Sequence, residues 1–126
     1  LSQVLASQEA VEKGVDELLL KDSDGNIVEA ISSNVFFLLG DEWVTPRLPE
    51  SGVAGVMREN LLDPDVQLLE GCREASVQLF QLDRCRAAFL CNAVRGIMPI
   101  ASINDTVLDL GPCAPIVERV KQYLHA

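Results

Sequence analysis

Short apolar runs separated by turn residues mark the first half of the chain. In each of two places, a pair of such runs flanks a glycine that follows or precedes an aspartate, which is the typical pattern of a β-hairpin. The runs are residues 17–22 (ELLLKD) and 27–29 (IVE) around Asp24-Gly25, and residues 34–39 (NVFFLL) and 43–45 (WVT) around Gly40-Asp41. We therefore expect two antiparallel hairpins here.

Apolar residues at helical spacing predict helices elsewhere, and shorter apolar runs predict further strands. The expected helices are residues 3–13, capped by Gly14, residues 55–62, residues 74–82, and a last helix from Pro112 or Pro115 to about Tyr123. The expected strands are residues 66–69, 87–91 and 98–103, with Gly96 in the turn between the last two, and residues 46–52 (PRLPESG) are expected to be loop. The order predicts an α+β fold with much antiparallel pairing.

Composition narrows the class of protein. With 126 residues and 48% hydrophobic residues, the chain predicts one folded domain, and no apolar run approaches the ~18–20 residues that span a bilayer. A net charge of −9, with ten scattered basic residues, argues against nucleic acid as a partner. No secretory signal precedes the first run. We expect a cytoplasmic protein that binds a small molecule, with no membrane partner.

The four cysteines do not form a metal-binding pattern. Cys72, Cys85, Cys91 and Cys113 include no closely spaced pair, and the single histidine, His125, is next to the end. Zinc sites usually contain close pairs, so no metal site is expected. Four cysteines could form two disulfides, but reduced thiols that pack as small core residues are the favoured interpretation.

A glycine-containing segment runs directly into the helix expected at residues 55–62. Gly52 and Gly55 would let the backbone approach a ligand closely, and Gly55, Val56 and Met57 would present unpaired N–H groups. Such groups and the positive end of the helix dipole suit an anion such as a phosphate. On spacing alone, the favoured interpretation is that these glycines are only turn residues.

Taken together, these segments resemble the signature of the fold-type IV pyridoxal-phosphate enzymes, a family of aminotransferases and lyases. The matching residues are Glu29, Asn34, Val35, Phe36, Thr45, Val53, Gly55, Val56 and Arg58. Trp43 is bulkier than the aliphatic residue expected there. Downstream, FLCNA at 89–93 and MPI at 98–100 are similar to the aminodeoxychorismate lyase branch, where branched-chain aminotransferases usually carry Gly-Thr-Ala.

The resemblance implies a fold. Residues 1–126 would be the single C-terminal, cofactor-binding large domain of the D-amino-acid-aminotransferase-like fold, in which antiparallel hairpins form a barrel-like sheet with flanking helices. The N-terminal domain would be absent. Members of the family are usually homodimers, so the whole protein is expected to be one.

The resemblance also implies roles for single residues, with pyridoxal 5'-phosphate as cofactor. Glu29 would accept a hydrogen bond from the ring nitrogen and keep it protonated. The Gly55–Met57 turn would hold the phosphate, with Asn92 as a second phosphate contact. Glu29 could instead be a solvated acid at a strand end, and Asn92 a turn-forming residue.

Two arginines have less specific roles. Arg58 corresponds to the family arginine after the phosphate turn, which either orients that turn or makes a plain structural ion pair. Arg95 lies in a loop near the family's site and could bind a substrate carboxylate through two hydrogen bonds. A solvent-facing loop arginine is the alternative for Arg95.

The family's chemistry needs a lysine that forms a Schiff base with the cofactor. The available lysines, Lys13, Lys21 and Lys121, do not match its position. The resemblance places it shortly before Leu1, in a stretch like Lys-x-Leu-Asn-Arg, so no catalytic residue is expected within the chain. A start directly after such an arginine also suggests cleavage of a longer protein.

The expected function of the whole protein is that of a lyase in folate biosynthesis, converting 4-amino-4-deoxychorismate to 4-aminobenzoate and pyruvate. A branched-chain or D-amino-acid aminotransferase is the alternative within the enzyme class. A non-catalytic fragment or interaction domain is the alternative outside it.

Overall fold

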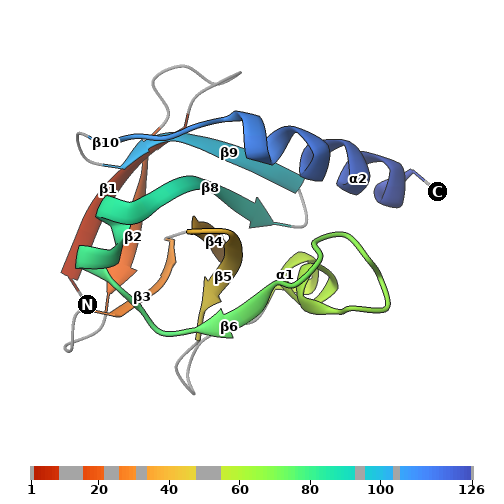
Figure 1. Cartoon of the computed structure of the whole chain (residues 1–126), viewed down its shortest axis with the longest axis horizontal. Helices are drawn as coiled ribbons and strands as arrows, with labels where there is room; N and C mark the ends of the chain where they lie inside the picture. The colour runs from red at the N-terminus through yellow and green to blue at the C-terminus, as the bar shows by residue number, and fades with distance from the viewer. Residues whose placement is uncertain are drawn as a thin grey trace.

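The computed structural model describes residues 2–8, 16–21, 26–30, 34–47, 55–92, 96–103 and 106–125 (Figure 1). Their strands are β1 (Ser2–Gln8), β2 (Asp16–Lys21), β3 (Asn26–Ala30), β4 (Asn34–Leu39), β5 (Glu42–Pro46), β6 (Arg73–Ala75), β7 (Val77–Gln78), β8 (Cys85–Asn92), β9 (Gly96–Ile103) and β10 (Thr106–Val107). Their helices are α1 (Val56–Leu62), α2 (Ala114–Leu124) and two 3-10 helices, η1 (Leu79–Arg84) and η2 (Gly111–Cys113).

The described strands join in one mixed sheet. Its order is β6-β5-β4-β8-β9-β1-β2-β3-β7, with β10 added on β9. The β5–β6 pair is parallel, and the other described pairs are antiparallel. The predicted α+β class is confirmed. The hydrogen-bonded order among these strands is open, although the sheet curls enough to bring β3 against β4 and β5.

Both predicted hairpins are confirmed. In the first, β2 pairs with β3, with Leu20 opposite Glu29, and its turn lies outside the described residues. In the second, β4 pairs with β5, with Phe37 opposite Val44. Gly40 in this second turn has φ +63°, a left-handed conformation that glycine adopts without steric cost.

The first predicted helix is wrong. Residues 2–8 form β1, which pairs with β2 on one side and with β9 on the other. Helix propensities differ by less than about 1 kcal/mol per residue among ordinary residues, so pairing with two strands overrides the helical spacing. Residues 9–13 and the proposed cap Gly14 lie outside the described part of the chain.

The predicted strand at residues 66–69 is also wrong, because this segment is a turn. The backbone N–H of Asp65 donates to Asp63 Oδ1 at 2.9 Å, and that of Val66 donates to the Asp63 carbonyl at 3.2 Å. Gln67 then takes a left-handed φ of 59°. The turn buries Leu68 and Leu69 in the core, which explains the apolar run without a strand.

The helix predicted at residues 74–82 is replaced by β6, β7 and η1. This segment pairs with neighbouring strands instead: β6 pairs with β5, with Glu74 opposite Thr45, and β7 pairs with β3. The helical part of this segment is η1, at whose start Gln78 and Gln81 form a capping box. The predictions for residues 55–62, 87–91, 98–103 and the last helix are confirmed as α1, β8, β9 and α2.

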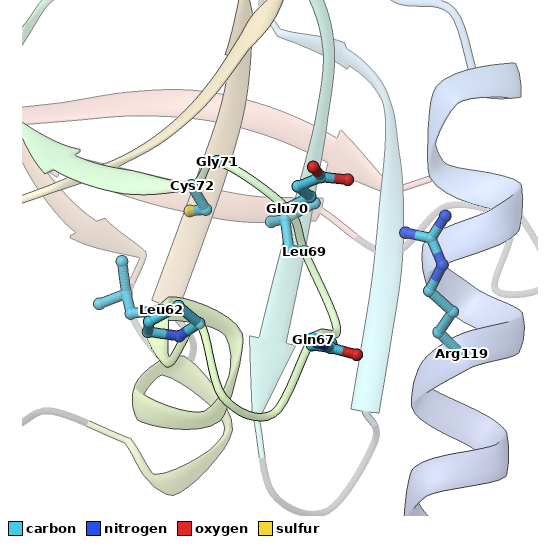
Figure 2. Close-up of a pocket in the computed structure, with 8 residues that line it drawn as sticks. Leu62, Gln67, Leu69, Glu70, Gly71, Cys72 and Arg119 are labelled. Carbon is cyan, nitrogen blue, oxygen red and sulfur yellow. The ribbon is translucent and has the colours of Figure 1, made fainter.

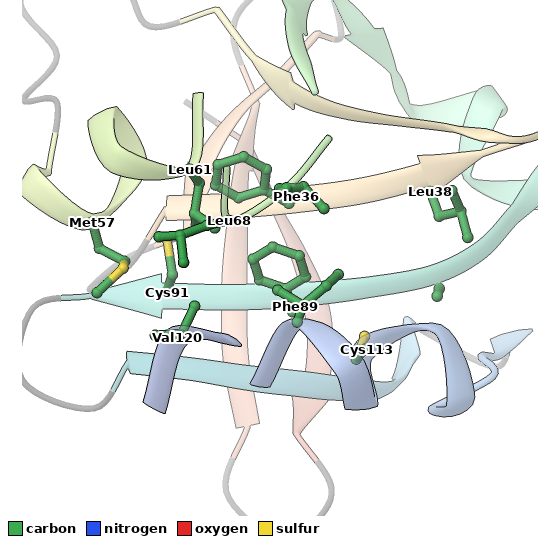
Figure 3. Close-up of a cluster of buried hydrophobic side chains, with 12 residues drawn as sticks. Phe36, Leu38, Met57, Leu61, Leu68, Phe89, Cys91, Cys113 and Val120 are labelled. Carbon is green, nitrogen blue, oxygen red and sulfur yellow. The ribbon is translucent and has the colours of Figure 1, made fainter. Parts of the chain in front are cut away.

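The central strands β4 and β8 are buried on both faces. Successive side chains of a strand point to opposite faces, so the unbroken run at 34–39 serves two cores. The core inside the curled sheet contains Val35, Phe37, Val44, Val77, Leu82, Cys85, Ala88, Leu90, Ile100, Ile103 and Leu108. The core under α1 and α2 contains Phe36, Leu38, Met57, Leu61, Leu68, Leu69, Ala87, Phe89, Cys91, Cys113, Ile116 and Val120 (Figure 3).

The second core fixes the two α-helices on the sheet. The Phe36 and Phe89 rings stack with their centroids 4.9 Å apart, and Trp43 lies 5.1 Å from Phe89 at a tilt of 54°. Figure 3 shows Met57 and Leu61 of α1 and Val120 of α2 approaching β4 and β8, the strands that carry Phe36 and Phe89. The start of α1 is thereby held at one end of β4.

Candidate functional site

One end of the sheet brings together residues that are far apart in sequence. Asn34, the first residue of β4, is paired with Cys91 of β8, and Asn92, the last residue of β8, is paired with Gly96. Met57 of α1 packs in the same core cluster as Cys91. The start of β4, the end of β8 and the start of α1 therefore meet, and we call this region the α1 end of the sheet.

Gly55 lies against the side chain of Asn34. A Cβ atom added at Gly55 would lie 2.7 Å from Asn34 Oδ1, so the Asn34 side chain would have to shift to admit any larger residue. The φ of Gly55 is −75°, so its backbone conformation is open to any residue. Close approach of Asn34, which is itself buried, explains why this position holds glycine.

Within the described part of the chain, no side chain caps the first turn of α1. Gly55 occupies the N-cap position without a side-chain hydrogen bond, and its carbonyl accepts from the N–H of Glu59 at 3.1 Å. The first N–H groups of an α-helix have no partner within the helix. Val56 is 70% exposed while Met57 is buried, so this turn has one open side. The N–H groups of a turn of this kind can donate hydrogen bonds to an oxyanion.

Arg58 is the buried cation of the α1 end. Its side chain is only 3% exposed, and Nη2 donates to the Pro46 carbonyl at 3.2 Å and to the Glu74 carboxylate. Nη1 lies 3.5 Å from Glu59 Oε1. Arg58 thus joins α1 to the last residue of β5 and to β6. Its Nε atom is buried and has no hydrogen-bond partner among the described residues.

Two thiols lie within the electrostatic reach of Arg58. Burial raises the pKa of Cys91 to about 12, and the positive charge of Arg58 opposes that effect. Burial likewise raises the pKa of Cys72 to about 12, and the positive charge of Arg58 again opposes that effect. Both side chains are therefore neutral thiols near pH 7, and all four cysteines are free.

The structure describes part of the predicted site. It brings the backbones of Gly55, Val56 and Met57 to the same end of the sheet as Asn92. Glu29 lies in β3, which contacts β4 and β5, but its side chain is outside what the structure describes. Arg95 also lies outside the described residues.

Asn34, Thr45 and Glu74 are polar residues of this region that the sequence analysis gave no role at the site. Thr45 is buried, and its hydroxyl donates to the Val35 carbonyl at 2.8 Å, joining β5 to β4. Asn34 and Thr45 were visible as parts of the family signature. Glu74 carried no such signal, because the sequence placed it on a helix that does not form.

A cavity of about 590 Å³ lies at the other end of α1, between the loop that follows it and α2. Leu62, Leu69 and Cys72 contribute to its lining, and Arg119 reaches towards it from α2 (Figure 2). Arg119 donates to the Leu68 carbonyl at 3.4 Å. Gly55 and Asn92 do not line this cavity, so it is separate from the α1 end of the sheet.

Other features carry no chemistry that can be assigned to this region. Lys121 lies on the exposed face of α2, 4.0 Å from Glu118, and Lys21 is the last residue of β2. Within the described ranges, no cluster of three or more potential metal ligands occurs, and no helix is long and apolar enough to cross a membrane.

Comparisons with known proteins place the chain in a family context. A family model described as amino-transferase class IV matches residues 1–103. A Synechocystis sp. protein named "Probable branched-chain-amino-acid aminotransferase" is 29% identical over the whole chain, which spans 41% of that relative. The 4-amino-4-deoxychorismate lyase structure from Pseudomonas aeruginosa is 29% identical, with a TM-score of 0.74 over 93% of this chain and 42% of that one. An aminotransferase from Brucella abortus, solved with pyridoxal phosphate, has the same fold, with 23% identity and a TM-score of 0.72 over 86% of this chain and 39% of that one.

Proposed function

Because the chain belongs to the amino-transferase class IV family, we propose that it is the cofactor-binding part of a lyase that converts 4-amino-4-deoxychorismate to 4-aminobenzoate and pyruvate. The family uses pyridoxal 5'-phosphate, whose ring, when bound, accepts electrons from the substrate carbon that loses a proton. The meeting of α1, β4 and β8 at one end of the sheet is the observation that carries the proposal.

The α1 end of the sheet fits the phosphate group of this cofactor. No described side chain caps the first turn of α1, and Gly55 carries no side chain that would push the turn away from Asn34. Arg58, which is paired with Glu74, adds a buried guanidinium beside the turn. Backbone N–H groups at a helix start, together with a nearby cation, suit a phosphate dianion.

Each predicted site residue has a place in the proposal. The N–H groups of Gly55, Val56 and Met57 bind the phosphate, and the Asn92 side chain makes a second phosphate contact from the end of β8. Glu29 accepts a hydrogen bond from the ring nitrogen and keeps it protonated. Arg95, which follows β8 along the chain, binds a carboxylate of the substrate.

The choice between lyase and aminotransferase depends on the end of β8. There the chain carries Cys91-Asn92-Ala93, which resembles the lyase branch, where branched-chain aminotransferases usually carry Gly-Thr-Ala. The Pseudomonas lyase, at 29% identity, supports this choice. The Synechocystis relative is equally identical over the whole chain, so a branched-chain aminotransferase is the second candidate.

Because the chain spans 41% of the Synechocystis relative, the activity we propose is that of a longer protein. In it, an N-terminal domain comes first, a segment shortly before Leu1 supplies the lysine that binds the cofactor, and residues 1–126 form the C-terminal domain. We propose a cytoplasmic homodimer. Four free cysteines, three of them buried, suit a reducing compartment.

The test uses the whole protein that carries this chain. It is mixed with pyridoxal phosphate and either 4-amino-4-deoxychorismate or a branched-chain amino acid with a 2-oxo acid. Release of 4-aminobenzoate and pyruvate in equal amounts supports the lyase, whereas amino-group transfer without 4-aminobenzoate supports the second candidate. If neither product forms and the protein does not bind the cofactor, the remaining candidate is a non-catalytic interaction domain.

A further inference from the structure

The buried guanidinium of Arg58 joins three elements at the proposed cofactor site. It lies on the first turn of α1, and its Nη2 atom reaches the Pro46 carbonyl at the end of β5 and the Glu74 carboxylate on β6. Residues 48–54, which connect β5 to α1 along the chain, lie outside the described part. Within the described part, Arg58 is the side chain that ties the start of α1 to both strands.

A buried cation at this position needs a reason beyond packing. Removing a guanidinium from water is costly unless its donors are paired, and replacing both partners of a buried ion pair with well-packed apolar residues is often neutral for stability. Here Nε has no described partner, although it is buried. In addition, the side chain of a helical residue leans towards the start of its helix, which is where the proposed phosphate turn lies.

We propose that Arg58 is a positioning residue for the phosphate of the cofactor. It holds the first turn of α1 at a fixed distance from β5 and β6, so that the N–H groups of Val56 and Met57 stay where a phosphate can reach them. This inference rests on the proposed function. It assigns Arg58 a role that a plain structural ion pair would not have.

The test compares two cofactor forms, pyridoxal phosphate and pyridoxal, which differ only in the phosphate. The ratio of their dissociation constants is measured for the whole wild-type protein and for Arg58→Met, with folding checked by circular dichroism. We expect the substitution to lower the preference for the phosphate form about tenfold, the loss of roughly one charge-assisted hydrogen bond. A general loss of stability would weaken both forms equally and leave the ratio unchanged.

Arg58→Lys separates charge from geometry. Lysine keeps the positive charge but lacks the planar fork of donors, so the preference should fall between those of the wild type and Arg58→Met. Full recovery by lysine would overturn the positioning argument, because charge alone would then suffice.

The outer ion pair of β6 supplies a matched control. Arg73 is on the same strand as Glu74 and pairs with Glu42 in solvent, so Arg73→Met should leave the ratio within about twofold. If Arg58→Met does not fold, Glu74→Met replaces it in the test. The preference for the phosphate form should then fall about threefold, because Arg58 loses one of its two acceptors.

The outcomes separate this inference from the proposed function. A wild-type protein that shows no preference for pyridoxal phosphate over pyridoxal contradicts both. A wild-type preference that folded Arg58→Met retains in full contradicts only the role of Arg58. A preference that falls in Arg58→Met and stays in Arg73→Met supports both.

Discussion

Two arginine–glutamate pairs meet the short strand β6 in opposite environments. The inner pair, Arg58–Glu74, lies at the α1 end of the sheet, and the arginine side chain is 3% exposed. The outer pair, Arg73–Glu42, lies towards the β4–β5 turn, and the arginine side chain is 58% exposed. The outer pair has the better geometry, with two hydrogen bonds of 2.8 and 2.9 Å.

The difference shows why the number of contacts is a poor guide to their energetic value. Water competes for every group of the outer pair, so even a bidentate pair there contributes little to stability. The inner guanidinium has lost its water, and the groups that replace the water cannot be removed without a large cost. A charged group that remains buried at one end of a sheet therefore indicates that the elements it joins must keep fixed positions.

The largest expected effect on stability comes from breaking the inner pair. Arg58→Met removes the donor to Pro46 and Glu74 and should lower the free energy of unfolding by about 3 kcal/mol, the lower end for a broken buried pair, because Glu74 is itself half exposed. Urea unfolding of the protein measures it. A loss below about 1 kcal/mol would mean that the inner pair is no stronger than an exposed one.

The next effect comes from the contact between Gly55 and Asn34. Gly55→Ala places a methyl group against Asn34 Oδ1, and overpacking of this kind costs about 1–3 kcal/mol. Asn34→Ala makes room for the methyl, so the double variant should be more stable than the sum of the two single effects predicts. Additive effects within experimental error would show that Asn34 is not the obstacle.

Sequence alone predicted the parts of this end that depend on local signals. The hairpin around Gly40 and the helix at residues 55–62 follow from turn residues and apolar spacing, and both are confirmed. The family signature at Asn34, Thr45, Gly55 and Arg58 identified residues that the fold then brings close together. What it assigned to Glu29, Asn92 and Arg95 stays a prediction.

Long-range pairing explains what sequence could not predict. Residues 2–8 have helical spacing but pair as β1 with β2 and β9. Residues 73–78 contain two short strands because they pair with β5 and β3. Glu74 shows the consequence for the site. On a helix it would have no link with Arg58, and only the parallel β5–β6 pair places it there.

Thr45 extends the comparison to a neutral buried group. Thr45→Val keeps the shape of the side chain but removes the hydroxyl that donates to the Val35 carbonyl, and should lower the free energy of unfolding by about 1 kcal/mol. Thr45→Ser retains the donor and serves as the control, because its loss then reports only the missing methyl group. If the valine variant matches wild type, the hydrogen bond contributes nothing net.

The smallest effect is expected at the outer pair. Arg73→Met removes both hydrogen bonds to Glu42, yet the free energy of unfolding should fall only slightly, because water replaces the lost contacts. Part of that loss should disappear in 1 M salt, where the screening length is about 3 Å. The same urea titrations, run at low and high salt beside Arg58→Met, measure both differences. A loss at Arg73 as large as that at Arg58 would show that burial does not separate the two pairs, and the buried guanidinium would then give no reason to look for a bound phosphate beside it.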